Sequence, residues 1–186
     1  MTEQIPTLIT ERLKLRPFEA ADAEEVNRHA GERIIAANLL SIPYPYSLEM
    51  AVEWIETHES AFAKGESVNF AITPLDTGVL VGAIGLSLQL EHDRAEIGYW
   101  IGHPHWNQGY ASEAARMVID FGFERWDLER ILAQHFAYNP ASGKVMTKSG
   151  MQYEGCLRHH IKKWGEYQDL LVYSILRQEW EQIAES

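Results

Sequence analysis

The sequence of 186 residues contains a single cysteine, Cys156, so no disulfide can form within the chain. Basic residues are scarce: 16 Lys and Arg stand against 27 Asp and Glu, for a formal net charge of −11. This balance argues against general nucleic-acid binding, which needs a basic surface to displace counterions. No apolar run approaches the roughly 20 residues of a membrane span, and the N-terminus lacks the pattern of a secretion signal. We therefore expect a cytoplasmic protein that binds neither nucleic acid nor a membrane.

Apolar residues make up 46% of the chain, enough for a sizeable core. The length fits one domain, which we expect to span residues 1–186. No repeat, linker or low-complexity tract interrupts the sequence.

Hydrophobic periodicity divides the chain into strands and helices. A strand is expected over 12–18, then a helix around 23–30, then a helix that begins after Ser47 as N-cap and runs to about Phe62. Three strand-like runs separated by turn signals, 69–73, 78–90 and 94–102, predict an antiparallel meander. Behind them the patterns indicate a helix over 109–125, a strand over 129–138, a helix over 139–150, and strands over 153–157 and 168–176. This order predicts a mixed α/β sheet with helices on its faces.

The segment WIGHPHWNQGYASEA, residues 100–114, joins the end of a strand near Ile101 to a helix that starts near Gly109. The first N–H groups of a helix have no partner within it, and with the helix dipole they form an anion site suited to a phosphate. Gly109 lacks the side chain that would keep a phosphate away, and Ala111 and Ser112 keep the helix start slim. Alternatively, the segment is only a tight helix start packed on a sheet. A Walker loop and a dinucleotide fingerprint are excluded, because neither GK[ST] nor GxGxxG is present.

The stretch HWNQGYASEA resembles the acyl-CoA pyrophosphate loop of the GNAT acetyltransferases, whose pattern is [QR]xxGx[GA]. Trp106 stands where Gln or Arg is usual. Such a Trp is typical of the branch that resembles the RimJ/RimL ribosomal-protein N-terminal acetyltransferases. Further segments resemble this branch in chain order: TERLKLRPF, PYPYS, AEIGYWI, NPASGKVMTKSGMQYEG and GEYQDLLVYSIL. The resemblance implies a GNAT fold, with a mixed, mostly antiparallel seven-stranded sheet, splayed fourth and fifth strands, and helices on both faces.

The resemblance also implies acetyl-CoA as the cofactor, with its pantetheine arm between the splayed strands. The arm would pair with the backbone of Tyr99, Trp100 and Ile101, where an N–H would polarise the thioester carbonyl. The pyrophosphate would meet the loop and helix start, formed by Trp106, Asn107, Gln108, Gly109, Tyr110, Ala111 and Ser112.

Asn139, Lys144 and Lys148 each allow a functional and a purely structural interpretation. By resemblance, Asn139 would meet the pantetheine arm or the substrate, but it could equally be an ordinary helix N-cap. Lys144 and Lys148 could reach the phosphates of CoA, although exposed helix lysines more often only meet solvent.

Glu96 is an acid within the apolar run AEIGYWI, and strand alternation places it on the face of Gly98 and Trp100. A carboxylate there could take the proton that an amine loses before it attacks, or it could form a cross-strand ion pair. By resemblance, Ser142 would protonate the leaving CoA thiolate, unless it is only a small polar residue at a helix start. Many GNAT enzymes use a Tyr further along this helix, but the matching residue is Met146, which cannot donate a proton.

The implied reaction is direct transfer of an acetyl group to a primary amine in a ternary complex. The best-matched acceptor is a protein N-terminal α-amine; a small amine and a non-catalytic CoA-binding module are alternatives. The substrate side would be lined by Tyr44, Tyr46, Trp54, Asp169 and Tyr173.

Two further expectations concern histidine and cysteine. The close histidine pairs lack a Cys cluster or HExxH, so no metal site is expected. Cys156 is expected to be a small buried side chain in a strand. A monomer and a homodimer both remain open.

Overall fold

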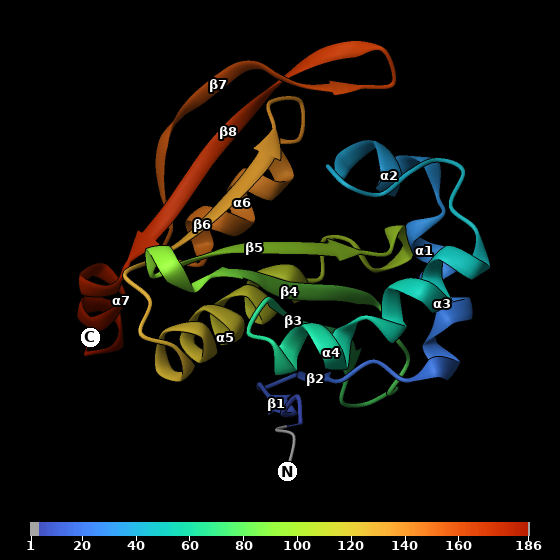
Figure 1. Cartoon of the computed structure of the whole chain (residues 1–186), viewed down its shortest axis with the longest axis horizontal. Coiled ribbons are helices and arrows are strands. Elements are labelled where there is room, and N and C mark those ends of the chain that lie inside the picture. Colours follow the sequence, from blue (N-terminus) through green and yellow to red (C-terminus); the bar gives the residue numbers. More distant parts are fainter. Residues whose placement is uncertain (1–3, 186) are drawn as a thin grey trace.

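The structure is a computed structural model that describes residues 4–185. These residues form one eight-stranded sheet in the order β1-β2-β3-β4-β5-β6-β8-β7 (Figure 1). Its strands are β1 Leu8–Ile9, β2 Leu13–Arg16, β3 Ser67–Pro74, β4 Gly82–Gln89, β5 Arg94–Ile101, β6 Arg130–Phe136, β7 Gln152–Lys163 and β8 Glu166–Leu176. Neighbouring strands are antiparallel except β5 and β6, which are parallel. The predicted mixed, mostly antiparallel sheet is confirmed, and the two-residue β1 adds an eighth strand.

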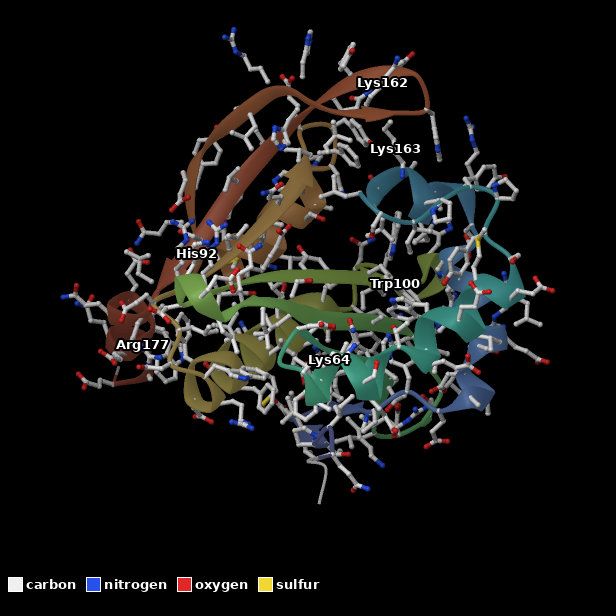
Figure 2. All side chains as sticks on the ribbon, viewed as in Figure 1. Lys64, His92, Trp100, Lys162, Lys163 and Arg177 are labelled. Carbon is white, nitrogen blue, oxygen red and sulfur yellow. The ribbon has the colours of Figure 1, made fainter. Side chains whose placement is uncertain are left out.

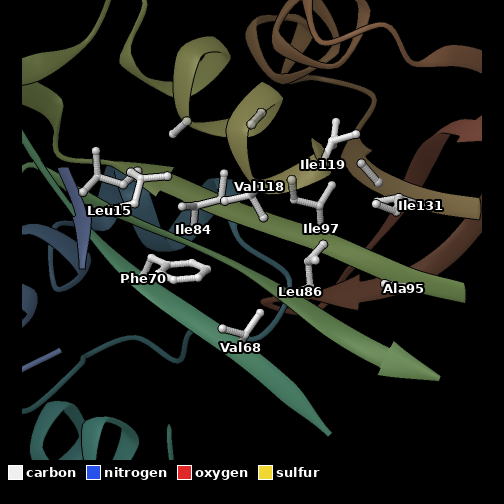
Figure 3. Packing of buried hydrophobic residues seen from close by; sticks show 14 of the residues in the cluster. Leu15, Val68, Phe70, Ile84, Leu86, Ala95, Ile97, Val118, Ile119 and Ile131 are labelled. Atoms are coloured by element: carbon white, nitrogen blue, oxygen red, sulfur yellow. The ribbon is translucent and has the colours of Figure 1, made fainter. Parts of the chain in front are cut away.

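Two apolar clusters hold helices against opposite faces of the sheet. The helices are α1 Ala23–Ala30, α2 Arg33–Asn38, α3 Leu48–Glu56, α4 His58–Ala63, α5 Tyr110–Arg125, α6 Pro140–Lys148 and α7 Arg177–Ala184. Figure 3 shows Val118 and Ile119 of α5 against Ile84, Leu86 and Ile97 of the sheet. Side chains alternate between faces along a strand, so the opposite face carries the second cluster, with residues of α1, α2 and α3 packed on Ala71, Ala83 and Trp100.

The sheet opens between β5 and β6. These strands pair only at their first residues, and the last pair is Glu96 with Leu132. β5 then continues to Ile101 without β6, while β6 pairs along its whole length with β8. In Figure 1, β6 and β8 rise away from β5 from a common end. Because β1 was not predicted, β5 and β6 are the fourth and fifth strands of the prediction, and their divergence is the predicted splay. It leaves the backbone of residues 97–101 without a strand partner on the β6 side.

Some local expectations need correction. Ser47 does cap a helix, since the Met50 amide donates to its Oγ at 3.3 Å. The helix expected to reach Phe62 breaks at Thr57 into α3 and α4. The short helices α2 and α7 were not predicted, and the last two strands form a longer hairpin than expected. Cys156 is exposed, not buried, because it lies on β7 at the edge of the sheet.

The described residues contain no helix long and apolar enough to cross a membrane.

Candidate functional site

A cleft of about 610 Å³ passes through the opening between β5 and β6. Every residue that the sequence predicts for cofactor binding lines it. The lining consists of residues 99–101 of β5, 105–112 of the loop and α5 start, 138–142 around the start of α6, Lys144, Val145 and Lys148 of α6, and Ile34, Ile35, Asn38 and Leu39 at α2. The cleft therefore joins the helix layers on the two faces of the sheet.

The loop before α5 has an unusual backbone that exposes its amides. Asn107 and Gly109 both adopt left-handed conformations, with φ of 61° and 81°. The first bond of the helix joins the Glu113 amide to the Gly109 carbonyl at 3.1 Å. Hence the amides at positions 110–112 have no earlier carbonyl of the helix to bond. Amides placed in this way, together with the helix dipole, favour a bound anion.

A clamp from the N-terminal turn holds this loop. Glu113, in the first turn of α5, accepts hydrogen bonds from Thr10 Oγ1 at 2.5 Å, the Arg12 amide at 2.9 Å and Arg12 Nε at 2.7 Å. Arg12 Nη1 also donates to the Gln108 carbonyl at 3.0 Å. Burial alone would raise the pKa of Glu113, but these hydrogen bonds and the Arg12 charge outweigh it and lower that pKa. The ion pair between Arg12 and Glu113 thus fixes the Gln108 carbonyl, which lies between the left-handed residues Asn107 and Gly109.

Trp106 ties the other end of the loop to β5. Its Nε1 donates to the Ile101 carbonyl at 2.6 Å, and its ring lies edge-on to His103 at 4.8 Å. Trp106, which stands where the pattern usually has Gln or Arg, thus anchors the loop to the end of β5.

Asn139 and Ser142 face each other at the start of α6. Asn139 occupies the N-cap position, but its side chain accepts no capping hydrogen bond; instead its Nδ2 donates to Ser142 Oγ at 3.1 Å. Since that oxygen acts as an acceptor, its own hydrogen remains available to donate. The Tyr99 hydroxyl donates to the Ser142 carbonyl at 3.1 Å, and burial raises the pKa of Tyr99. Met146, in contrast, is buried in the core.

Glu96 lies at the vertex of the opening, half-buried, between Ser87 of β4 and Leu132 of β6. Among the described residues its carboxylate has no hydrogen bond and no ion pair within 4 Å. The cross-strand ion pair does not form, because Arg94 Nε donates to Gln89 and Arg130 pairs with a different glutamate. Burial raises the pKa of Glu96, and the Arg94 charge opposes this shift only in part.

The residues predicted for the substrate side do not line the cleft. Tyr44 is exposed and its ring faces Trp164 at 5.8 Å. Tyr46 and Trp54 pack into the apolar cluster on the α1–α3 face, where Trp54 lies edge-on to Phe18 at 5.0 Å.

Asp169 and Tyr173 have structural contacts in β8. Asp169 Oδ1 accepts the amide of His159, whose φ of 50° marks an irregularity in β7. The Tyr173 ring lies 5.6 Å from that of buried His135. His135 and Tyr173 pack against Gly143 of α6, where an added Cβ would lie 2.9 Å from His135 Nε2 and 3.2 Å from the Tyr173 hydroxyl.

Sequence reasoning missed the wall contributed by α2 and Tyr138. The Tyr138 hydroxyl donates to the Ala37 carbonyl across the cleft. Lys163, near the tip of the β7–β8 hairpin in Figure 2, donates to the carbonyls of Leu39 at 2.7 Å and Ile42 at 3.2 Å. The sequence does contain one sign of α2, the two adjacent isoleucines at 34–35. The stretch with two prolines that follows led us to predict a loop there and no helix.

Comparison with known proteins agrees with this geometry. The family model described as an acetyltransferase (GNAT) domain matches residues 12–152. The uncharacterized N-acetyltransferase YoaA of Bacillus subtilis is 36% identical over 182 residues, covering 92% of this chain and 97% of that protein. The putative ribosomal N-acetyltransferase YdaF of Bacillus subtilis is 28% identical over 181 residues, covering 93% and 96%.

Similarity in fold extends to a solved RimL ribosomal alpha-N-protein acetyltransferase in complex with coenzyme A. It superimposes with a TM-score of 0.82 at 20% identity, over 94% of this chain and 98% of that one. The chain therefore belongs to the GNAT acetyltransferases and is an N-acetyltransferase that uses acetyl-CoA.

Proposed function

We propose that this N-acetyltransferase acts on a protein or peptide N-terminal α-amine, by direct transfer in a ternary complex. The observation that carries the proposal is Glu96, a half-buried carboxylate that has no hydrogen bond or ion pair among residues 4–185, at the vertex of the opening between β5 and β6. The relative named a putative ribosomal N-acetyltransferase supports the choice of acceptor.

The residues of the cleft suit acetyl-CoA, which when bound supplies an acetyl group activated as a thioester. The amides at 110–112 would hold the pyrophosphate, and Gly109 permits a close approach, since a Cβ there would fill the loop 3.2 Å from Arg12 Nη2. The backbone of Tyr99, Trp100 and Ile101, which β6 does not cover, would pair with the pantetheine amides, although the Ile101 carbonyl already accepts a hydrogen bond from Trp106 Nε1. Lys144 and Lys148 line the cleft wall, where their charges favour phosphate.

Glu96 would take the proton from the acceptor ammonium before attack, directly or through water. Its raised pKa, caused by burial, brings the carboxylate closer to the operating range of a base. Ser142 would hold the proton for the leaving thiolate, because its hydroxyl accepts from Asn139 and keeps its hydrogen free. Holding both partners in one cleft would supply much of the rate.

The test compares acceptors and one pair of matched variants. We expect acetylation of short peptides with a free α-amine, with higher kcat/KM than for spermidine or a free amino acid. Glu96→Gln should lower kcat about 10²-fold or more and leave acetyl-CoA binding unchanged, whereas exposed Glu91→Gln should behave as wild type. Exclusive acetylation of spermidine, or full activity of Glu96→Gln, would contradict the proposal.

A further inference from the structure

Gly98 leaves open space beside Glu96 at the free edge of β5. A Cβ built on Gly98 would meet no heavy atom within 4 Å. Its φ is not positive, so the backbone does not require glycine there. Packing and conformation therefore both permit a side chain at a position where the chain has none.

The carboxamide of Asn69, on β3, lies near this space on the same face of the sheet. Gly98 pairs with Gly85 of β4, which pairs with Asn69 of β3. The Asn69 side chain leans over Gly85, since its Oδ1 lies 2.4 Å from the Cβ position of that glycine. Strands are about 4.8 Å apart, so the carboxamide lies roughly one strand from the space above Gly98. Among the described residues it makes no hydrogen bond.

Two residues of the candidate site, Glu96 and Trp100, border the same space. Glu96 and Trp100 flank Gly98 on the same face, one pleat away on either side. Trp100 lines the cleft, and Figure 2 shows it toward the α2 end of β5. On the remaining side β6 has already diverged from β5. A group placed above Gly98 would thus lie between Glu96 and Trp100 on one face of β5, about one strand from the Asn69 carboxamide.

We infer that the space above Gly98 binds the part of the acceptor next to its amine, and that Asn69 hydrogen-bonds an amide group there. The inference rests on the proposed function, whose acceptor site it defines. A carboxamide both donates and accepts, so it matches the N–H and C=O of a first peptide group. A polyamine has no acceptor oxygen at that distance. The class selected is therefore a primary amine followed closely by an amide.

The first test fills the space. Gly98→Val should raise the acceptor KM about tenfold or more, with the Kd of acetyl-CoA and the melting temperature unchanged. Gly155→Val is the matched control, because Gly155 is also a strand glycine with nothing within 4 Å of its Cβ, but lies on β7. An unchanged KM in Gly98→Val would overturn the inference.

The second test removes the carboxamide. Asn69→Ala should lower kcat/KM about tenfold for a dipeptide amide, the effect of one neutral hydrogen bond, and leave a plain alkylamine of equal length unaffected. Equal losses for both amines, or no loss, would overturn the role of Asn69. If wild type acetylates only amines without an amide, the proposed acceptor is wrong. In that event Gly98→Val, assayed with the amine that reacts, still decides whether this space binds the acceptor.

Discussion

Replacing Arg12 by Met removes the guanidinium that links the N-terminal turn to the pyrophosphate loop, and keeps the apolar stem. The change breaks the bonds from Nε to Glu113 and from Nη1 to the Gln108 carbonyl, at 2.7 and 3.0 Å. The loop therefore loses its bonds to the N-terminal turn, while Glu113 keeps its bonds from Thr10 and the Arg12 amide and Trp106 still holds the loop to β5.

The expected magnitude follows from exposure. A hydrogen bond to a charged group contributes about 1.5–3 kcal/mol, but the Arg12 side chain is 48% exposed and that of Glu113 only 12%. Solvent screening of the exposed partner reduces the gain, so we expect a loss of about 1–2 kcal/mol in the free energy of unfolding. If the same energy positions the loop for phosphate, the Kd of acetyl-CoA should rise about 5- to 30-fold.

The assay is a double-mutant cycle on Arg12→Met and Glu113→Gln, with urea unfolding for stability and calorimetry for acetyl-CoA affinity. We expect a coupling of about 1–2 kcal/mol in both measurements. Additive effects on stability would refute the clamp. Coupled stability with unchanged affinity would show that the clamp supports the fold and not the phosphate site.

Three further predictions concern the loop before α5, the candidate base and a buried histidine of α4. Gly109→Ala should weaken acetyl-CoA binding about tenfold, because a left-handed non-glycine residue costs about 1–2 kcal/mol and its Cβ meets Arg12; Gly78→Ala, also at positive φ but in open space, should cost stability without affecting binding. In wild type, kcat/KM should fall as pH drops through the raised pKa of Glu96, and Glu96→Gln should lose that acidic limb; an identical pH profile would exclude Glu96 as the base. Burial lowers the pKa of His58 to about 4, and neither ring nitrogen has a hydrogen-bond partner in the part of the chain that the structure describes. Because the unfolded state then binds the proton first, stability should decline from about pH 6.5 toward pH 4 by up to about 3 kcal/mol. Urea unfolding of His58→Leu should show a smaller decline, and an equal one would contradict this role.

The part of the cleft lined by the end of β5 and the start of α5 could be predicted because local rules determine its backbone. The loop around Gly109 needs only a strand end, a left-handed glycine and a helix start, and these are adjacent in the sequence. The position of Glu96 could also be predicted from the sequence, since strand alternation fixes its face and an acid in an apolar strand stands out. The sequence could not predict that Glu96 forms no ion pair among the described residues, because this depends on Arg94 and Arg130 bonding to other side chains.

The wall of the cleft that α2 and Tyr138 form could not be predicted in the same way. It depends on tertiary contacts between distant segments, such as Lys163 with the end of α2 and Tyr138 with Ala37. Tyr44, Trp54 and Asp169 were chosen for their chemistry, yet the fold uses them for packing and for supporting a strand irregularity. Gly98 and Asn69 lie 29 positions apart in the sequence and meet only through the register of three strands.

The most direct measurement offers the enzyme a peptide that carries both a free α-amine and a lysine side chain, with acetyl-CoA, and locates the acetyl group by tandem mass spectrometry. The account predicts acetylation at the α-nitrogen in wild type and in Glu91→Gln, and at least a hundredfold slower reaction in Glu96→Gln. Acetylation confined to the lysine nitrogen, or an equal rate in Glu96→Gln, would contradict it.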